Sequence, residues 1–215
     1  MDFIYKIAKA IVGMLPAPLR NPLRRYRRKA MIAKWERSGK PIPPPHQVKQ
    51  SVIEYYRKRS GYDILIETGT YRGDMVYAQR NNFKRIFSIE LGEDLWKKAV
   101  KRFARYRHIC IMQGDSSKVL DNITKDLQEP AIFWLDGHYS AGITARGDKD
   151  CPIYGEINAI FRYKKLDHIL LVDDACYFNG TGDYPTLDEL TAYIRSKDKR
   201  YRVSVDDDII RCTVD

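Results

Sequence analysis

Acidic side chains that could bind a metal ion stand directly after two apolar runs of this chain. Residues 131–135 are followed by Asp136, and residues 169–172 by Asp173 and Asp174. If both runs are parallel strands of one sheet, their carboxyl ends meet at one edge and the three carboxylates lie together. Carboxylates that crowd in this way repel one another unless protons or a cation compensate, and hard oxygen ligands suit Mg²⁺, Mn²⁺ or Ca²⁺. We therefore predict a divalent metal site at the three aspartates, with Mg²⁺ as the favoured ion.

The sequence Asp136-Gly137-His138 offers a base beside this site. A divalent ion would clamp a vicinal diol or a similar oxygen pair and lower the pKa of a hydroxyl. A neutral imidazole can take a hydroxyl proton near pH 7. We predict His138 and Asp136 as the catalytic residues; the alternative for His138 is a structural role, with its ring bound to a backbone carbonyl.

A second set of polar residues follows three earlier β-rich runs. The first run ends in the turn Glu67-Thr68-Gly69-Thr70-Tyr71-Arg72-Gly73, the second in Glu90, 23 residues after Glu67, and the third is followed by Asp115. Glycines in such a turn let the backbone approach a ligand. Glu67, the first acid, suits a cationic amino group, and an acid about 20 residues further on, here Glu90, can accept hydrogen bonds from ribose hydroxyls. The turn is not G-x-G-x-x-G, so a pyrophosphate cradle is poorly supported, and taken alone it could be an ordinary loop. The predicted cofactor-binding residues are Glu67, Gly69, Thr70, Gly73, Glu90, Asp115 and Ser116.

The elements that must position these residues alternate between strand and helix from Asp63 onward. The predicted strands are 63–68, 85–90, 108–113, 131–136, 168–173, 201–206 and 209–214, and the predicted helices are 47–59, 71–82, 93–106, 116–127, 152–164 and 185–196. Such alternation implies right-handed crossovers and a parallel sheet covered on both faces. The last two strands leave no room for a helix and must form an antiparallel hairpin. The predicted fold is α/β, a Rossmann-like, doubly wound, mostly parallel seven-stranded sheet with a C-terminal antiparallel hairpin.

These motifs together resemble class I S-adenosylmethionine (SAM)-dependent methyltransferases over roughly residues 61–215, a family whose sheet typically ends in such a hairpin. The resemblance implies SAM as the cofactor. It implies that Glu67 and Gly69 face the methionine part, that Glu90 binds the ribose, and that Asp115 with Ser116 holds the adenine end.

The acids after the fourth and fifth strands are similar to those of metal-dependent, macrocin-type sugar O-methyltransferases. That resemblance implies Asp136, Asp173 and Asp174 as metal ligands, and it implies a sugar or glycan hydroxyl as methyl acceptor. Where those enzymes place an aspartate base two residues beyond the first ligand, this chain has His138. The alternatives are methylation of RNA or protein, and a non-catalytic SAM-binding scaffold associated with a membrane. No Asn-Pro-Pro-Tyr-like motif for amino-nitrogen acceptors is present.

The net charge of +10 is unevenly distributed along the chain. Residues 1–60 hold 15 Lys/Arg and 3 Asp/Glu, whereas residues 61–215 hold 23 and 25. The basicity therefore belongs to an N-terminal extension, which argues against nucleic acid as a partner and favours an anionic membrane surface or an acidic protein. We predict a basic, amphipathic, helical extension over 1–46 and a methyltransferase domain over 47–215.

Residues 3–15 place apolar side chains at helical spacing, and the prolines at 16, 18 and 22 and a basic cluster over 20–29 follow. The segment is too short to span a bilayer, but an apolar face beside a polybasic cluster is typical of a surface anchor. We predict a cytoplasmic protein, peripheral on the inner face of the membrane through residues 1–40, with its four dispersed cysteines reduced. The alternative is a helix packed on its own domain with a solvated charge run, and a homo-oligomer is left open. The glycine-rich stretch 139–155 is a candidate lid, and 177–184 a candidate opposite wall.

Overall fold

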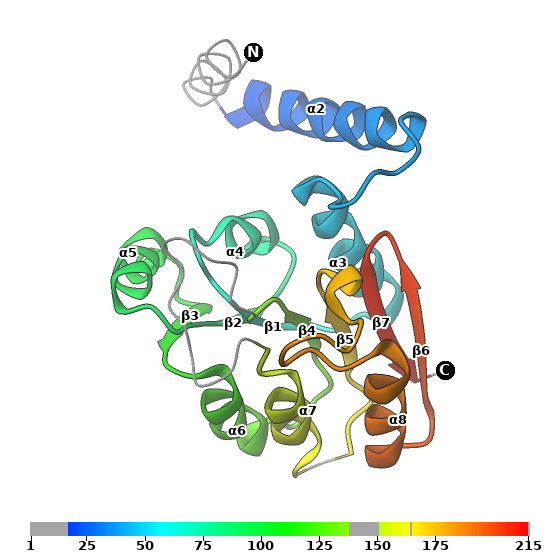
Figure 1. The fold of residues 1–215 in the computed structure, drawn as a ribbon. Helices are drawn as coiled ribbons and strands as arrows, with labels where there is room; N and C mark the ends of the chain where they lie inside the picture. Colours follow the sequence, from blue (N-terminus) through cyan, green and yellow to red (C-terminus); the bar gives the residue numbers. More distant parts are fainter. Residues whose placement is uncertain (1–16, 138–150, 164, 215) are drawn as a thin grey trace. The chain divides into compact units, whose positions relative to one another are not determined.

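The computed structural model describes residues 17–137, 151–163 and 165–214 (Figure 1). The predicted helix over 3–15, the predicted base His138 and most of the candidate lid lie outside the described residues. The chain divides into two compact units, Met1–Lys49 and Gln50–Asp215.

The first unit contains helix α2 (Ala17–Arg37) and the start of α3 (His46–Ser60). Pro18 lies in the first turn of α2, where a helix needs no backbone N–H. The helix ends where Trp35, which is 6% exposed, donates its indole Nε1–H to the carbonyl of Pro41 at 2.8 Å. Gly39 adopts a left-handed φ of 84° in this turn. The contact folds the proline-rich connector back onto the end of α2.

The second unit is built on one seven-stranded sheet with the strand order β3-β2-β1-β4-β5-β7-β6. The pairs among β1 to β5 are parallel, whereas β7 is antiparallel to both β5 and β6. This confirms the predicted fold class, including the hairpin at the C-terminal end. The strands are β1 (Ile64–Thr68), β2 (Arg85–Glu90), β3 (Ile109–Gln113), β4 (Ile132–Leu135), β5 (Ile169–Val172), β6 (Tyr201–Asp206) and β7 (Ile209–Val214).

Helices cover the two faces of the sheet, α4 and α5 on one face and α6, α7 and α8 on the other (Figure 1). Their bounds are α4 (Asp74–Gln79), α5 (Glu93–Phe103), α6 (Ser116–Asp126), α7 (Ile153–Phe161) and α8 (Leu187–Lys197), with a short 3-10 turn η1 (Ala175–Tyr177) after β5. α4 is shorter than the predicted helix 71–82, because Tyr71 and Gly73 take left-handed φ values of 48° and 72° and keep the turn after β1 from being helical.

Alternate residues of the central strands feed two apolar cores. Ile66 and Phe133 point to the face where Ile157 of α7 and Leu190 of α8 pack. Leu65 and Trp134 point to the opposite face, where they belong to a cluster with side chains of three helices: Val52, Ile53, Met75, Val76 and Phe103. The parallel strands are therefore buried on both faces, which explains their continuous apolar runs.

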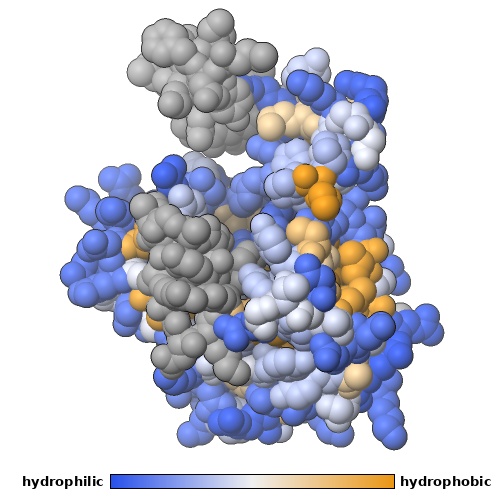
Figure 2. Space-filling model, in the orientation of Figure 1, coloured by the Kyte–Doolittle hydropathy of each residue, from blue (hydrophilic) through white to orange (hydrophobic). Residues whose placement is uncertain are grey.

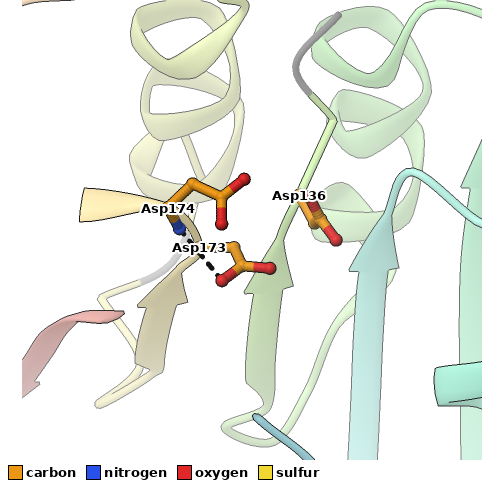
Figure 3. A group of neighbouring side chains, drawn as sticks. All are labelled: Asp136, Asp173 and Asp174. Carbon is orange, nitrogen blue, oxygen red and sulfur yellow. Dashed lines mark hydrogen bonds between the residues drawn. The ribbon is translucent and has the colours of Figure 1, made fainter. Parts of the chain in front are cut away.

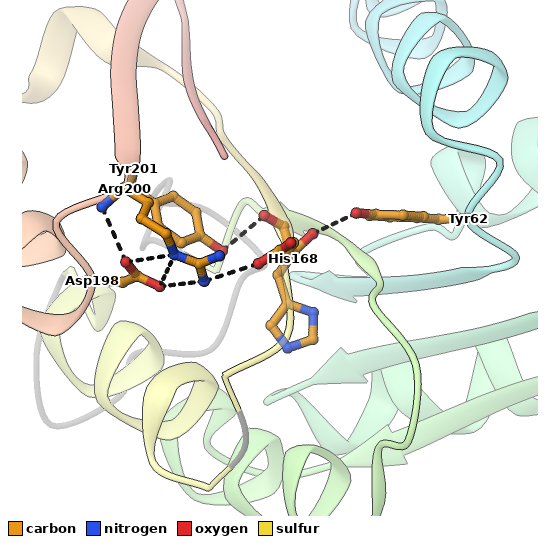
Figure 4. Close-up of polar contacts among 6 residues, drawn as sticks. Tyr62, His168, Asp198, Arg200 and Tyr201 are labelled. Carbon is orange, nitrogen blue, oxygen red and sulfur yellow. Dashed lines mark hydrogen bonds and ion pairs between the residues drawn. The ribbon is translucent and has the colours of Figure 1, made fainter. Parts of the chain in front are cut away.

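A polar network fixes the amino end of β5, away from the carboxyl edge (Figure 4). The Tyr201 hydroxyl donates to the His168 carbonyl at 2.8 Å, and the Tyr62 hydroxyl donates to the Asp167 carbonyl at 2.7 Å. Arg200 bridges the carboxylates of Asp167 and Asp198 at 2.9 and 2.7 Å. The His168 ring is buried and its Nδ1 accepts the backbone N–H of Ala131 at 3.1 Å. Burial lowers the pKa of His168 to about 4, so the ring is neutral near pH 7.

The described surface is mostly hydrophilic in the view of Figure 2, with apolar residues gathered in a few patches. Among the described residues, no helix combines the length and apolar character that crossing a membrane requires.

Candidate active site

The turn that follows β1 lies against the segment that follows β4, two strands that are neighbours in the sheet. The backbone N–H groups of Gly69 and Thr70 both donate to the carbonyl of Ile89, at 3.0 and 3.1 Å, which ties the turn to β2. Gly69 has a φ of +82°, and a Cβ built on it would lie 2.2 Å from the carbonyl oxygen of Asp136. No side chain larger than hydrogen fits there, so the glycine is required by both conformation and space.

The three predicted metal ligands converge, as Figure 3 shows. Asp136 follows β4, while Asp173 and Asp174 follow the neighbouring strand β5. One carboxylate oxygen from each lies within 4.8 Å of the other two, and Asp173 is 1% exposed. Three hard oxygen donors at this separation fit a divalent ion such as Mg²⁺ or Mn²⁺ and repel one another without positive charge between them. The residues present therefore fit the predicted metal.

The backbone of each metal-site acid is held differently. The N–H of Asp136 donates to the carbonyl and the hydroxyl of Thr68, both at 3.2 Å, and the N–H of Asp173 donates to the Leu135 carbonyl at 3.0 Å. Asp174 lies past the last backbone hydrogen bond between β4 and β5. Its N–H donates to the side chain of Asp173 at 2.9 Å, and its φ of 53° is left-handed. The first two acids are positioned by the sheet and the third by the turn that follows.

Glu67, predicted to face the methionine part of SAM, is 2% exposed inside the domain. Ser88 donates its hydroxyl to the Glu67 carboxyl, and the hydroxyls of Ser88 and Thr70 lie 2.5 Å apart. Burial, with a smaller contribution from the charge of Glu90, raises the pKa of Glu67 to about 8. Glu67 is therefore a neutral acid near pH 7 that ties the turn after β1 to β2, and its contact with a cofactor stays a prediction.

Glu90 ends β2 beside the same turn. Its carboxylate accepts the backbone N–H of Tyr71 at 2.6 Å and that of Gly92 at 2.9 Å, one on each oxygen. Each carboxylate oxygen can accept more than one hydrogen bond, so Glu90 keeps acceptor capacity for hydroxyl groups. A ribose at this edge fits the residues that are present.

Asp115 is the N-cap of α6 and accepts the backbone N–H of Ser117 at 2.9 Å and its hydroxyl at 2.6 Å. Burial alone would raise the pKa of Asp115, but these hydrogen bonds and the charge of Lys118 hold it below its ordinary value. Ser116 is the first residue of the helix. Gly73 caps α4, and a Cβ there would lie 2.6 Å from the ring of Phe103, so its absent side chain serves helix packing. Cofactor contacts of the three residues remain predictions.

Sequence reasoning missed several residues that build this edge. Ser88 was hidden within an apolar run, although a single polar residue between Phe87 and Ile89 is a signal of a buried partner. Glu156 of α7 is buried, and its Oε1 lies 2.9 Å from the position of a Cβ on Gly137. Such a contact could not be found from spacing alone.

Neither a family model nor a curated protein sequence matches this chain. Solved structures do match. A methyltransferase from Podospora anserina, PaMTH1, bound to S-adenosylhomocysteine (SAH), is 15% identical, with 94% of this chain and 98% of that chain covered and a TM-score of 0.54. An SAH-bound O-methyltransferase from Bacillus cereus is 12% identical, with coverages of 87% and 90% and a TM-score of 0.58.

A third match is the O-methyltransferase TomG from Streptomyces achromogenes, which is involved in tomaymycin synthesis and was solved with SAM. It is 12% identical, with 87% of this chain and 88% of that chain covered, at a TM-score of 0.54. At such identities the likeness concerns the fold. The fold of this chain is that of SAM-dependent methyltransferases, as the sequence motifs predicted.

Proposed function

We propose that this chain is a SAM-dependent O-methyltransferase that uses a divalent metal ion and methylates a hydroxyl of a sugar or glycan. The observation that carries the proposal is the contact of Gly69 with Asp136. Gly69 lies in the turn that we predict to bind SAM, the methyl donor, and Asp136 belongs to the cluster of three carboxylates. SAM when bound supplies the methyl group, and a divalent ion supplies positive charge that favours loss of a proton from an acceptor hydroxyl.

The residues of this chain have distinct tasks in the proposed reaction. Glu90, at the end of β2, accepts hydrogen bonds from the ribose hydroxyls of SAM. Asp115 and Ser116, at the start of α6, hold the adenine end of SAM. Asp136, Asp173 and Asp174 hold the ion. His138, two residues after Asp136, takes the proton of the hydroxyl.

The charge of the second unit supports a neutral acceptor. Residues 50–125, which contain β1 to β3, hold 15 Lys/Arg and 9 Asp/Glu, whereas residues 126–215, which contain β4 to β7, hold 11 and 17. The excess of acid thus falls in the stretch of sequence that carries the three aspartates. The phosphodiester backbone of RNA would meet repulsion from these acids, which disfavours RNA as the acceptor relative to an uncharged sugar.

Transfer of label from [methyl-³H]SAM tests the proposal. The full chain is incubated with Mg²⁺ and separate acceptors: methyl glycosides, a bacterial polysaccharide extract, total RNA and a protein extract. We expect label in the carbohydrate fractions, its loss with EDTA and its return with Mg²⁺. The rate should fall at least about a hundredfold in His138→Ala, because a positioned general base contributes that much, and it should also fall in Asp173→Asn, which removes a proposed metal ligand. Label that appears in RNA or protein and ignores EDTA would establish the alternative function. SAM binding without label in any fraction would favour the non-catalytic scaffold, and absence of SAM binding would overturn the proposal.

A second proposal concerns location: the first unit docks on an anionic membrane surface. Residues 1–49 hold 12 Lys/Arg and 2 Asp/Glu, a net charge of +10 that equals that of the whole chain. Tyr26 of α2 is 71% exposed. Its ring is partly apolar and stands among basic side chains, a combination that suits the lipid headgroup layer of a membrane. The exposed side chains between residues 25 and 37 are Arg25, Tyr26, Lys29, Ala30, Lys34, Glu36 and Arg37.

Flotation of the full chain with vesicles tests this location. We expect binding to phosphatidylglycerol vesicles but not to phosphatidylcholine vesicles, and reduced binding when Arg25, Lys29 and Lys34 become Gln. The matched control removes as many exposed charges from the α5 region, as Lys98→Gln, Lys101→Gln and Arg105→Gln. Equal loss in both triple variants would indicate unspecific attraction, and stronger binding to polyuridylate than to vesicles would point to nucleic acid.

A further inference from the structure

We infer that Asp208, at the tip of the β6–β7 hairpin, is a positioning residue that fixes Asp174 for metal binding. The inference rests on the proposed metal site. Asp208 is far from Asp174 in the sequence and comes from an antiparallel hairpin that supplies none of the three candidate ligands.

Asp208 holds the turn that follows Asp174 by two hydrogen bonds. Its backbone carbonyl accepts the N–H of Ala175 at 2.9 Å, and its side-chain Oδ1 accepts the N–H of Cys176 at 2.8 Å. Ala175 and Cys176 are the first residues of η1, whose N-cap is Asp174. The hairpin tip thus receives the two backbone donors directly after the third metal-site acid.

Asp174 needs this support more than the other two acids do. Asp136 and Asp173 continue hydrogen bonding across the strands, to Thr68 and Leu135. Asp174 has a left-handed φ of 53°, a conformation that costs about 1–2 kcal/mol for a residue with a Cβ and persists only where surrounding contacts impose it. The bonds to Asp208 are such contacts.

The residue type at position 208 is itself informative. Asp207 and Asp208 are the two central residues of the hairpin turn, with φ values of 54° and 59°. Such a turn favours asparagine, aspartate or glycine at its first central position and glycine at its second, so the aspartate at position 208 departs from the usual choice. Asp208 is only 9% exposed. Burying a carboxylate costs free energy, so a turn that only joined β6 to β7 would gain nothing from one. Its Oδ1 has a specific partner at Cys176, which explains why a side chain is useful here.

The experiment compares Asp208→Gly, Asp208→Asn and Asp207→Gly in the full chain. Gly suits the left-handed turn and keeps the carbonyl that receives Ala175, so Asp208→Gly removes the contacts of the Asp208 carboxylate with the backbone and the thiol of Cys176. Asn keeps an oxygen at the Oδ1 position and is the rescue. Asp207→Gly makes the same change at the neighbouring turn position. The readouts are Mn²⁺ affinity by titration calorimetry, SAH affinity, and exchange of the Cys176 amide by NMR.

We expect Asp208→Gly to weaken Mn²⁺ binding about tenfold, the lower end of what loss of an outer-shell partner costs, and to speed Cys176 exchange. SAH affinity should stay the same, and both other variants should resemble the wild type. Unchanged Mn²⁺ affinity in Asp208→Gly would overturn the inference alone. A wild type that binds no Mn²⁺ would overturn the metal site and the inference with it, while Cys176 exchange still reports whether Asp208 holds η1. If Asp208→Gly does not fold, Asp208→Ser replaces it, since its shorter side chain cannot span to Cys176.

Discussion

Gly69 packs against the backbone of Asp136 so closely that a Cβ on Gly69 would lie 2.2 Å from the Asp136 carbonyl oxygen. The two residues are far apart in sequence and follow neighbouring parallel strands. The turn predicted to receive the methyl donor and the segment that carries the first metal-site acid are therefore one structural unit.

The first prediction concerns this contact. Gly69→Ala should lower the free energy of unfolding by clearly more than Gly61→Ala, because both glycines have similar φ values, 82° and 76°, but nothing lies within 4 Å of a Cβ at residue 61. The control should lose about 1–2 kcal/mol, the cost of a left-handed alanine. Urea unfolding measures the difference. Equal losses in the two variants would show that the contact with Asp136 is not tight.

The second prediction concerns Glu67 and pH. Its pKa is raised from an ordinary 4.5 to about 8 in the folded protein, so the folded state holds a proton that the unfolded state releases. Its contribution to stability is fully present below pH 4.5 and is lost as the pH rises through 8. Glu67→Gln, which keeps a neutral acceptor for Ser88, should remove this loss. Melting temperatures of the wild type and the variant between pH 5 and 9, without ligand, give the answer; parallel curves would contradict the buried neutral acid.

The third prediction concerns His168, which should lower the stability of the fold at acidic pH, whereas Glu67 lowers it at alkaline pH. Burial lowers its pKa from an ordinary 6.5 to about 4, so the unfolded chain takes up a proton before the folded chain does. Stability should fall as the pH drops from 6.5 to 4, by about 3 kcal/mol at 1.36 kcal/mol per pKa unit. In His168→Asn, an amide oxygen can accept the Ala131 N–H and this fall should be absent. Urea unfolding at pH 4.5, 5.5 and 7 measures it, and an equal fall in the variant would assign it to other groups.

Much of the fold and the placement of the three aspartates could be predicted from sequence, for a physical reason. Strands buried on both faces are continuous apolar runs, and in parallel strands each run ends at the same edge, so Asp136, Asp173 and Asp174 had to converge. The hairpin of β6 and β7 followed from the lack of room for a helix.

The supports of the site could not be predicted in this way. Asp208 reaches η1 only because β7 inserts beside β5, and strand order is not encoded in the local pattern. Glu67 could be recognised as an acid at a strand end, but its neutral state depends on burial against β2, where Ser88 is its partner. Pairing across the sheet is long-range information, which a period of two residues does not carry.

The most direct test of the central claim is calorimetric titration of SAH into the full chain, because every proposed role depends on a cofactor site at this edge. We expect a single site in the wild type, at least about tenfold weaker binding in Glu90→Ala, and wild-type affinity in Glu93→Ala, which removes an exposed acid three residues further along the chain. A loss of about 1.4 kcal/mol in binding free energy corresponds to that tenfold change. A folded wild type that binds no SAH, or a Glu90→Ala variant that binds it unchanged, would contradict the account.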